Sequence, residues 1–166
     1  MKIRDELPGD HAAIRQITEA AFAQAEHSSG TEGTIVDALR HAHALTISLV
    51  AEDGGALLGH VAFSSVEIDG QQCHWFGLGP VSVRPDRQRQ GIGTALIAEG
   101  LARLRALDAR GCVVLGDPAY YGRFGFAPDA GLKLVGMPPD YFTRLVLAGG
   151  PAKGTVTYHA AFGEER

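Results

Sequence analysis

One stretch of the chain constrains its fold most strongly, because it joins a strand to a helix through a short turn that contains two glycines. The β-branched residues Val81–Val83 predict the end of a strand, which Pro85 stops. The polar turn Gln88–Gln90 then leads through Gly91 and Gly93 into an apolar run at helical spacing. A strand that passes directly into a helix favours an α/β fold.

This turn predicts an anion-binding site. A helix start carries roughly half a positive charge and unpaired backbone N–H groups, and glycines let a ligand approach the backbone closely. Arg87 and Arg89 add positive charge at its edge. We therefore expect a phosphate or pyrophosphate here, and we call the turn the anion cradle, with the candidate binding residues Gln88, Arg89, Gln90, Gly91, Ile92, Gly93 and Thr94.

The cradle differs from two common phosphate-binding loops. No Lys-Ser or Lys-Thr pair follows the glycines, as it would in a Walker A loop, and Gly91-Ile92-Gly93 lacks the third glycine of the dinucleotide fingerprint. Taken alone, a Gly-x-Gly sequence also fits an ordinary junction between a loop and a helix. The residues by themselves leave both interpretations open.

Composition excludes several classes of function. The 166 residues are 45% hydrophobic and 20% charged with a net charge of −4, which predicts one globular domain and no nucleic-acid partner. No apolar run reaches the ~20 residues of a membrane span, and the N-terminus has no signal-peptide pattern.

Cys73 and Cys112 lie in apolar runs and predict two buried free thiols, so a cytoplasmic protein is expected. The scattered histidines predict no metal site.

Hydrophobic periodicity and turn residues predict a single α/β domain with a mixed, mostly antiparallel sheet. Residues 127–150 are rich in Pro and Gly and predict no clear element. The expected strands are Met1–Glu6, Leu45–Glu52, Leu57–Ile68, Cys73–Val83, Cys112–Leu115 and Thr155–Phe162. The expected helices run from about 10 to 24 with Asp10 as N-cap, from Thr31 or Glu32 to Arg40, from Ile92 to near Gly111, and from Pro118 to Tyr121.

Two motifs resemble those of the GNAT family of N-acetyltransferases. The first is Val83-x-Pro85 followed by Gln88-x-x-Gly91-x-Gly93, and the second is Tyr121-Gly-Arg-Phe-Gly125-Phe126. Two longer stretches are similar to the YhbS-like branch of that family: Leu78-Gly-Pro-x-x-Val-x-Pro85, and then Leu115-Gly-Asp-Pro-x-Tyr-Tyr-x-Arg-Phe-Gly-Phe126. The resemblance implies that residues 1–166 form one N-acetyltransferase domain. It also implies a sheet that splays between its fourth and fifth strands, with helices on both faces.

The resemblance also implies a cofactor and a chemistry. The cofactor would be acetyl-CoA, with its pyrophosphate in the cradle and its pantetheine arm paired to the backbone of Val81, Ser82 and Val83. Tyr121 would be the general acid that protonates the leaving thiolate, because a phenol with a pKa of ~10 is protonated at neutral pH. The acceptor would be an amine of a small molecule or a protein, reached by direct transfer in a ternary complex, and a homodimer is compatible with the family.

Three questions stay open at this stage. No acidic residue stands in the strand before the cradle, where many family members carry a general base, and the candidates are Glu67, Glu32, His60, Ser64 and His74. The acceptor region would include the loop Ala25–Thr31, with Glu26 and His27, and the Tyr141-Phe142 pair. Two rival functions are a non-catalytic acyl-CoA sensor and an ATP-binding domain that uses the Gly-x-Gly turn.

Overall fold

The computed structural model describes residues 1–23 and 32–163, which fall into two compact units. The first unit comprises Met1–Phe63 and Gly79–Arg103, and the second comprises Ser64–Leu78 and Leu104–Arg166. The strands β3 (Ala56–Ile68) and β4 (Gln71–Val83) contribute residues to both units. The expected loop Ala25–Thr31, with Glu26 and His27, lies outside the described residues.

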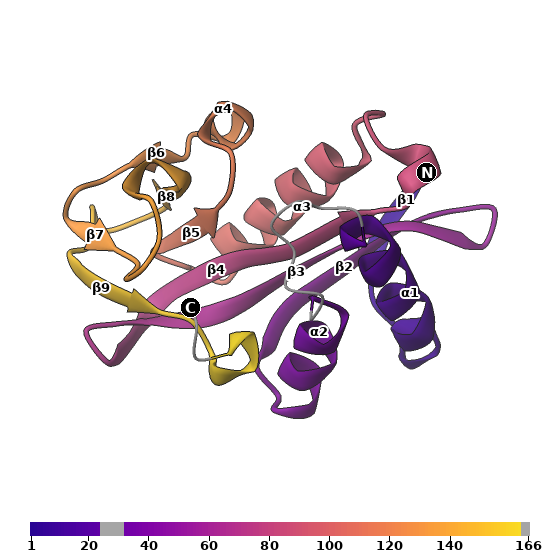
Figure 1. Ribbon diagram of the computed structural model, residues 1–166, viewed down its shortest axis with the longest axis horizontal. Coiled ribbons are helices and arrows are strands. Elements are labelled where there is room, and N and C mark those ends of the chain that lie inside the picture. The colour runs from indigo at the N-terminus through magenta and orange to yellow at the C-terminus, as the bar shows by residue number, and fades with distance from the viewer. Residues whose placement is uncertain (24–31, 164–166) are drawn as a thin grey trace. The chain divides into compact units, whose positions relative to one another are not determined.

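In the first unit, two N-terminal helices and two strands surround a small core (Figure 1). Ile14, Val36 and Val50 are buried together, as the helical and strand periodicity of the sequence predicts. Strand β1 pairs with β2 in antiparallel register, from Lys2 opposite Glu52 to Asp5 opposite Leu49. The elements are β1 (Lys2–Asp5), α1 (His11–Phe22), α2 (Glu32–His41) and β2 (Leu45–Asp53).

Asp10 occupies the predicted N-cap position of α1, but it does not cap the helix with its side chain. It ends the short 3₁₀ helix Pro8–Asp10, and its carboxylate makes no capping hydrogen bond to α1. Its carboxylate instead accepts the backbone N–H of Leu7 at 2.7 Å and pairs with Arg4, also at 2.7 Å. The guanidinium of Arg4 is the main cause that holds the pKa of Asp10 below its ordinary value. An ion pair with the first strand therefore competes successfully with a helix cap.

Helix α3 (Ile92–Ala106) covers the face of the first-unit strands opposite α1 and α2 (Figure 1). Within that unit Gly59 faces Ile92 and Leu96, and Gly100 lies directly against the buried ring of Phe63. Neither glycine position has room for a side chain. The helix ends at Ala106, several residues before the predicted end near Gly111, because the following residues form a turn in which Ala109 N–H donates to the carbonyl of Leu104.

The second unit is built on the short strand β5 (Gly111–Leu115). It runs parallel to β4, from Trp75 opposite Gly111 to Gly77 opposite Val113, and antiparallel to β8 (Phe142–Val146). The sheet is therefore mixed, as predicted. By hydrogen-bonded neighbours, the strand order is β1-β2-β3-β4 in the first unit and β3-β4-β5-β8-β6 in the second. The core of the second unit comprises Val66, Ile68, Trp75, Val113, Leu132, Leu134, Phe142 and Val156.

Residues 127–150, which predict no clear element, supply three strands of the second unit. These are β6 (Ala127–Pro128), β7 (Leu132–Lys133) and β8, and the first two have only two residues each. The final strand β9 (Gly154–Thr157) is shorter than the predicted Thr155–Phe162. It ends because the Tyr158 ring turns onto β4 at Gly77 and His159 caps the 3₁₀ helix Ala160–Phe162.

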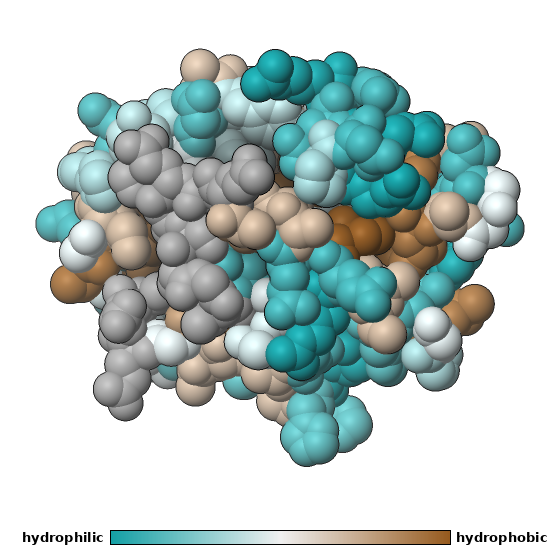
Figure 2. Space-filling model, turned by 45° about the vertical axis from the view of Figure 1, so that its right-hand side comes forward, coloured by the Kyte–Doolittle hydropathy of each residue, from teal (hydrophilic) through white to brown (hydrophobic). Residues whose placement is uncertain are grey.

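On the face drawn in Figure 2, hydrophilic residues cover much of the surface and hydrophobic residues form scattered patches. Cys112 is buried as predicted, but Cys73 is only half-buried, and both are free thiols. None of the helices within residues 1–23 and 32–163 has the combined length and apolar content that crossing a bilayer requires.

We expect Gly100→Ala to destabilise the protein, because its Cβ would collide with the ring of Phe63, which is 0% exposed. Overpacking of this kind costs about 1–3 kcal/mol, which exceeds the ~1 kcal/mol that alanine gains over glycine inside a helix. Urea unfolding would measure the change in the free energy of unfolding. The control is Gly122→Ala, at a position with right-handed backbone and no atom within 4 Å of the added carbon. Equal stability of the two variants would contradict the tight packing at Gly100.

Candidate functional site

The anion cradle forms where β4 ends and α3 begins, as the sequence predicts. The backbone N–H of Arg84 donates to Leu58 at 2.8 Å, and the 3₁₀ helix Pro85–Arg87 then turns the chain away from the sheet. Gly91 has a φ of 84°, and a helical bond runs from Ala95 N–H to the carbonyl of Gly91 at 3.0 Å. The first N–H groups of an α-helix, here those of Ile92 and Gly93, have no carbonyl one turn back to bond. They are the donors that an anion would use.

The side chains of the cradle hold the turn in place. Gln88 donates its amide to the carbonyl of Val83 at 3.1 Å, which ties the turn to the strand end. Arg87 donates to the Gln90 side chain at 3.3 Å. Arg89 is exposed and has a φ of 64°, a left-handed conformation that an arginine seldom adopts outside tight turns. Ile92, at 5% exposure, anchors the first turn of α3 in the core.

The last residues of β4 offer a backbone edge beside the cradle. In an antiparallel ladder the N–H and C=O groups of alternate residues point to opposite sides. Arg84 bonds toward β3, so Ser82 also points toward β3 and the backbone groups of Val81 and Val83 point away from it. Among the described residues, the recorded β4–β5 pairing ends at Gly77 and does not reach these groups. An extended ligand can therefore pair with them as an added strand would.

Ser82 itself fixes the position of α1 rather than offering its side chain to a ligand. Its hydroxyl is buried and lies 3.2 Å from the hydroxyl of Thr18. Thr18 donates its only hydroxyl proton to the carbonyl of Ile14 at 2.8 Å, so Ser82 is the donor to Thr18. Because the backbone groups of Ser82 point toward β3, the predicted backbone contact with the cofactor depends on Val81 and Val83.

Tyr121 stands at the end of α4 (Pro118–Tyr121), a single helical turn that follows β5. Asp117 starts that turn by accepting the N–H of Ala119 at 2.9 Å, as the Asp-Pro sequence predicts. The Tyr121 ring makes an edge-to-face contact with Phe126 at a centroid distance of 6.1 Å. It also lies over Gly116, where an added Cβ would come within 2.6 Å of the ring. The absence of a side chain at Gly116 thus creates the space that Tyr121 fills.

The surroundings of Tyr121 keep its phenol protonated. Burial, with smaller contributions from Tyr120 and Cys112, raises the pKa of Tyr121 to about 12. The neighbouring Tyr120 is in a different setting, because the Arg123 guanidinium lies 4.2 Å from the centre of its ring. Of the two tyrosines, Tyr121 is the one held as a hydrogen-bond and proton donor. It belongs to the second unit, whereas the cradle and the end of β4 belong to the first.

The candidate general bases differ in how exposed they are and in the groups that surround them. Glu67 is exposed at the edge where β3 pairs with β9, and His74 is exposed with its Nδ1 2.9 Å from the carbonyl of Asp108. Glu32 is buried in the first turn of α2. Ser64 is 1% exposed, and its hydroxyl has no hydrogen-bond partner. Among the described residues, no cluster of three or more histidine, cysteine or acidic side chains is arranged to hold a metal ion.

His60 belongs to a buried polar network that the sequence does not reveal. Its Nε2 lies 2.8 Å from the hydroxyl of Ser48, which donates to the carboxylate of Glu6. The Arg40 guanidinium donates two hydrogen bonds of 2.8 Å to the same carboxylate. Because the Ser48 proton goes to Glu6, His60 must donate from Nε2, which leaves its buried Nδ1 as an acceptor without a partner. Burial lowers the pKa of His60 to about 4.

Comparisons with known proteins agree with this geometry. The family described as acetyltransferase (GNAT) domain matches residues 2–128. The N-acetyltransferase YhbS of Escherichia coli K12, described as uncharacterized, is 39% identical over 127 residues, or 76% of this chain and 73% of the relative. A solved GNAT family acetyltransferase from Brucella melitensis, in complex with acetyl-CoA, is 55% identical with a TM-score of 0.87 over 97% of each chain. YhbS from Escherichia coli in complex with CoA is 34% identical with a TM-score of 0.89, over 98% of this chain and 92% of that one.

The buried, neutral His60 should make stability depend on pH. The unfolded chain binds a proton at His60 near its ordinary pKa of 6.5, whereas the folded chain resists that proton until about pH 4. His60 therefore lowers the free energy of unfolding as the pH falls between these values, by up to about 3 kcal/mol. Urea unfolding at pH 7 and pH 4.5 would measure the loss, and we expect a smaller loss in His60→Gln.

The matched control for this measurement is His41→Gln, which removes an exposed histidine at the end of α2. It should retain the wild-type loss of stability on acidification. Comparing variants is necessary because Glu6 also makes stability depend on pH: Arg40 and Ser48 hold the pKa of its carboxylate below the ordinary value of 4.5 against the effect of burial, so its contribution is lost as the pH falls below about 4.5, at the lower end of the range. An unchanged pH dependence in His60→Gln would show that His60 does not remain neutral in the fold.

Proposed function

The chain belongs to the GNAT acetyltransferase family and is an N-acetyltransferase, and we propose that it uses acetyl-CoA to acetylate an amine of a small molecule or a protein. Transfer would be direct, within a ternary complex. The matched family region, residues 2–128, includes all of the first unit except Met1 and the part of the second that carries Tyr121. We therefore propose that residues 1–166 work as one N-acetyltransferase domain.

One observation carries the choice of cofactor: the backbone donors of the cradle stand directly beside the backbone edge of Val81 and Val83. The cradle would bind the pyrophosphate through N–H groups between Gly91 and Thr94, assisted by Arg89. The strand edge would pair with the amides of the pantetheine arm. Acetyl-CoA carries both groups next to each other, because its pyrophosphate is joined directly to the pantetheine arm. The two solved relatives hold acetyl-CoA and CoA, which supports this assignment.

The residues of the chain would contribute orientation, charge stabilisation and a proton. Acetyl-CoA supplies the thioester whose C–S bond breaks as the C–N bond to the amine forms. A backbone N–H of Val81 or Val83 would stabilise the negative charge that develops on the carbonyl oxygen, a contact worth about 3–4 kcal/mol in other enzymes. Tyr121 would donate its proton to the departing sulfur, and the proton that the amine nitrogen loses would pass to water, from which the Tyr121 phenolate regains a proton. The phenol is protonated at neutral pH, as this role requires, although burial makes it a weaker acid than an ordinary tyrosine.

We also propose that the protein works in the cytoplasm. Its two cysteines are free thiols, one of them buried. This is the state expected in a reducing compartment.

We expect Gly91→Asp to abolish the binding of CoA. The position has a φ of 84°, and the new carboxylate would put negative charge where the pyrophosphate should bind. Isothermal titration calorimetry with CoA would measure the loss, which we expect to exceed 100-fold, with ATP titrated as a check on the nucleotide-binding rival. The control is Gly70→Asp at the β3–β4 hairpin, where φ is 79° and the space is equally open. Absence of CoA binding by the wild type would contradict the proposal.

We expect Tyr121→Phe to lower kcat by about 10²-fold while the affinity for CoA changes little, because removal of a general acid slows the chemical step alone. The release of CoA thiol in the presence of an amine panel would measure the rate. Tyr120→Phe is the matched control and should stay within about threefold of the wild type. Release of CoA thiol at equal rates by Tyr121→Phe and the wild type would remove Tyr121 from the mechanism. Tight CoA binding without transfer to any amine would favour the acyl-CoA sensor.

A further inference from the structure

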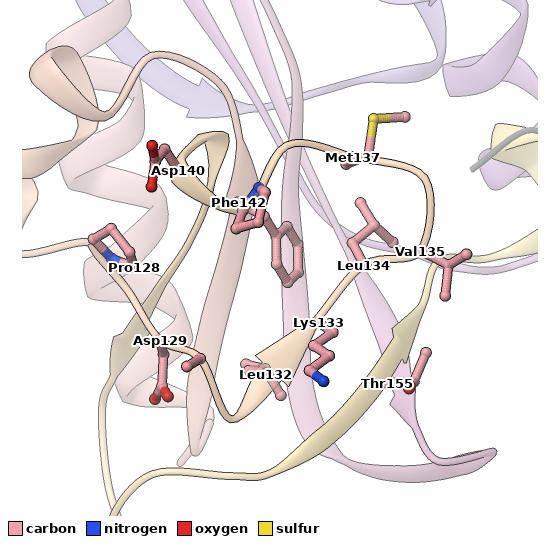
Figure 3. Close-up of a pocket in the computed structure, with 12 residues that line it drawn as sticks. Pro128, Asp129, Leu132, Lys133, Leu134, Val135, Met137, Asp140, Phe142 and Thr155 are labelled. Carbon is pink, nitrogen blue, oxygen red and sulfur yellow. The ribbon is translucent and has the colours of Figure 1, made fainter.

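A cavity of about 480 Å³ opens in the second unit, and its lining includes none of the residues that the proposed mechanism uses. We call it the C-terminal pocket, and its apolar lining includes Leu132, Leu134, Val135, Met137 and Phe142 (Figure 3). Small-molecule sites in proteins typically measure roughly 300–1,000 Å³ and have mostly apolar walls. The volume and the lining of this pocket both fall within that description.

The floor of the pocket is continuous with the core of the second unit. Leu132, Leu134 and Phe142 are 4–6% exposed and belong to the same buried cluster as Trp75. Phe142 lies opposite Leu115 in the β5–β8 ladder, so the strand pairing fixes its position. The opening therefore exposes apolar groups that the rest of the core would otherwise cover. An apolar molecule that displaces water from them gains about 25 cal/mol for each Å² removed from water.

The walls of the pocket are held in place without any ligand. Asp129 accepts the N–H of Gly131 at 2.9 Å and pairs with Arg144 at 3.1 Å, which fixes the turn at one side. At the other side, Tyr141 N–H donates to Pro138 at 3.1 Å, and the carbonyl of Tyr141 accepts the N–H of Gly116 at 2.9 Å. A pocket that is already formed loses little conformational freedom when it is filled. Met137 adds a flexible side chain that can adapt to the shape of a ligand.

The charged residues of the pocket lie at its edge. Asp140 and Lys133 are exposed and stand at well-separated positions around the opening in Figure 3. The carboxylate of Asp129 already has partners in the N–H of Gly131 and in Arg144. These partners, the N–H of Gly131 first, hold the pKa of Asp129 below its ordinary value. The interior thus offers apolar surface, with charges of both signs only at the mouth. This distribution suits a ligand with an uncharged apolar body whose polar group remains at the opening.

We propose that the C-terminal pocket binds an apolar organic molecule of the size of a substituted aromatic ring or a branched aliphatic chain. This binding does not depend on acetyl transfer. Two sources share the chemistry: an amine acceptor with an apolar body, which would deepen the proposed function, or a separate ligand that is not acetylated. In both cases the apolar body enters the pocket beside Leu134 and Phe142.

The single tryptophan of the chain provides the test. Trp75 packs in the cluster that forms the pocket floor, so its fluorescence should report ligand binding. We would titrate 2-phenylethylamine, 2-phenylethanol, which has the same ring without the amine, and putrescine, which has amines without a ring. We expect the two ring compounds to bind and putrescine not to bind. The same titrations with acetyl-CoA present would show, by CoA release, whether 2-phenylethylamine is acetylated.

Two variants locate the binding. Met137→Gln makes one wall polar and should weaken both ring compounds at least about fourfold, the loss expected for about one buried methylene group. Ala130→Phe adds bulk from an exposed position in the lining and should have a similar effect. Leu107→Gln, the matched change at an exposed leucine outside the pocket, should leave affinity within twofold of the wild type.

The outcomes separate this proposal from the proposed function. Binding of the ring compounds that both pocket variants weaken supports the pocket, whether or not any amine is acetylated. Acetylation of 2-phenylethylamine, also reduced by the variants, identifies the ligand as the acceptor, and binding without acetylation identifies a separate ligand. The proposal that the C-terminal pocket binds an apolar molecule would be contradicted in two cases. The ring compounds could fail to bind, or they could bind with an affinity that neither Met137→Gln nor Ala130→Phe changes.

Discussion

The first turn of any α-helix has backbone N–H groups without carbonyl partners, and the function of this chain depends on where one such turn is placed. Helix α3 begins at Ile92, directly after a strand whose end carries the backbone edge of Val81 and Val83. Gly91 allows the chain to bend between the two, and Gln88 ties the bend to the strand. The result is a row of donors at the end of a sheet. Under the proposed function, this arrangement would let a chain with a net negative charge bind the pyrophosphate of its cofactor.

The absence of a side chain is equally important at three packing positions. Gly59 and Gly100 let α3 lie close against β3, which fixes the helix that carries the cradle. Gly116 leaves the space that the Tyr121 ring occupies in the second unit. The burial that follows raises the pKa of Tyr121 and keeps its proton available. In each unit, therefore, a glycine without a side chain determines how a functional element packs: helix α3 in the first unit and the Tyr121 ring in the second.

Local features of the sequence predicted the strand, turn and helix that form the cradle and the α4 turn, because glycine spacing and capping residues act within a few residues of one another. Non-local features escaped prediction. The carboxylate of Asp10 pairs with Arg4 of β1 instead of capping α1, and no local rule reveals that competition. The two-residue strand β7 exists only because β9 lies beside it. The network of Glu6, Ser48 and His60 joins β2, β3 and the residue that follows β1, so no spacing in the sequence marks it.

The measurement that tests the central claim most directly is hydrogen–deuterium exchange of the backbone amides with and without CoA. It observes the very N–H groups on which the account depends, without any change to the sequence. We predict that CoA slows exchange at the amides from Gly91 to Thr94 and at Val81 and Val83, since each becomes bonded to the ligand. Unchanged exchange at these amides under saturating CoA would contradict the account, because the ligand would then be bound elsewhere.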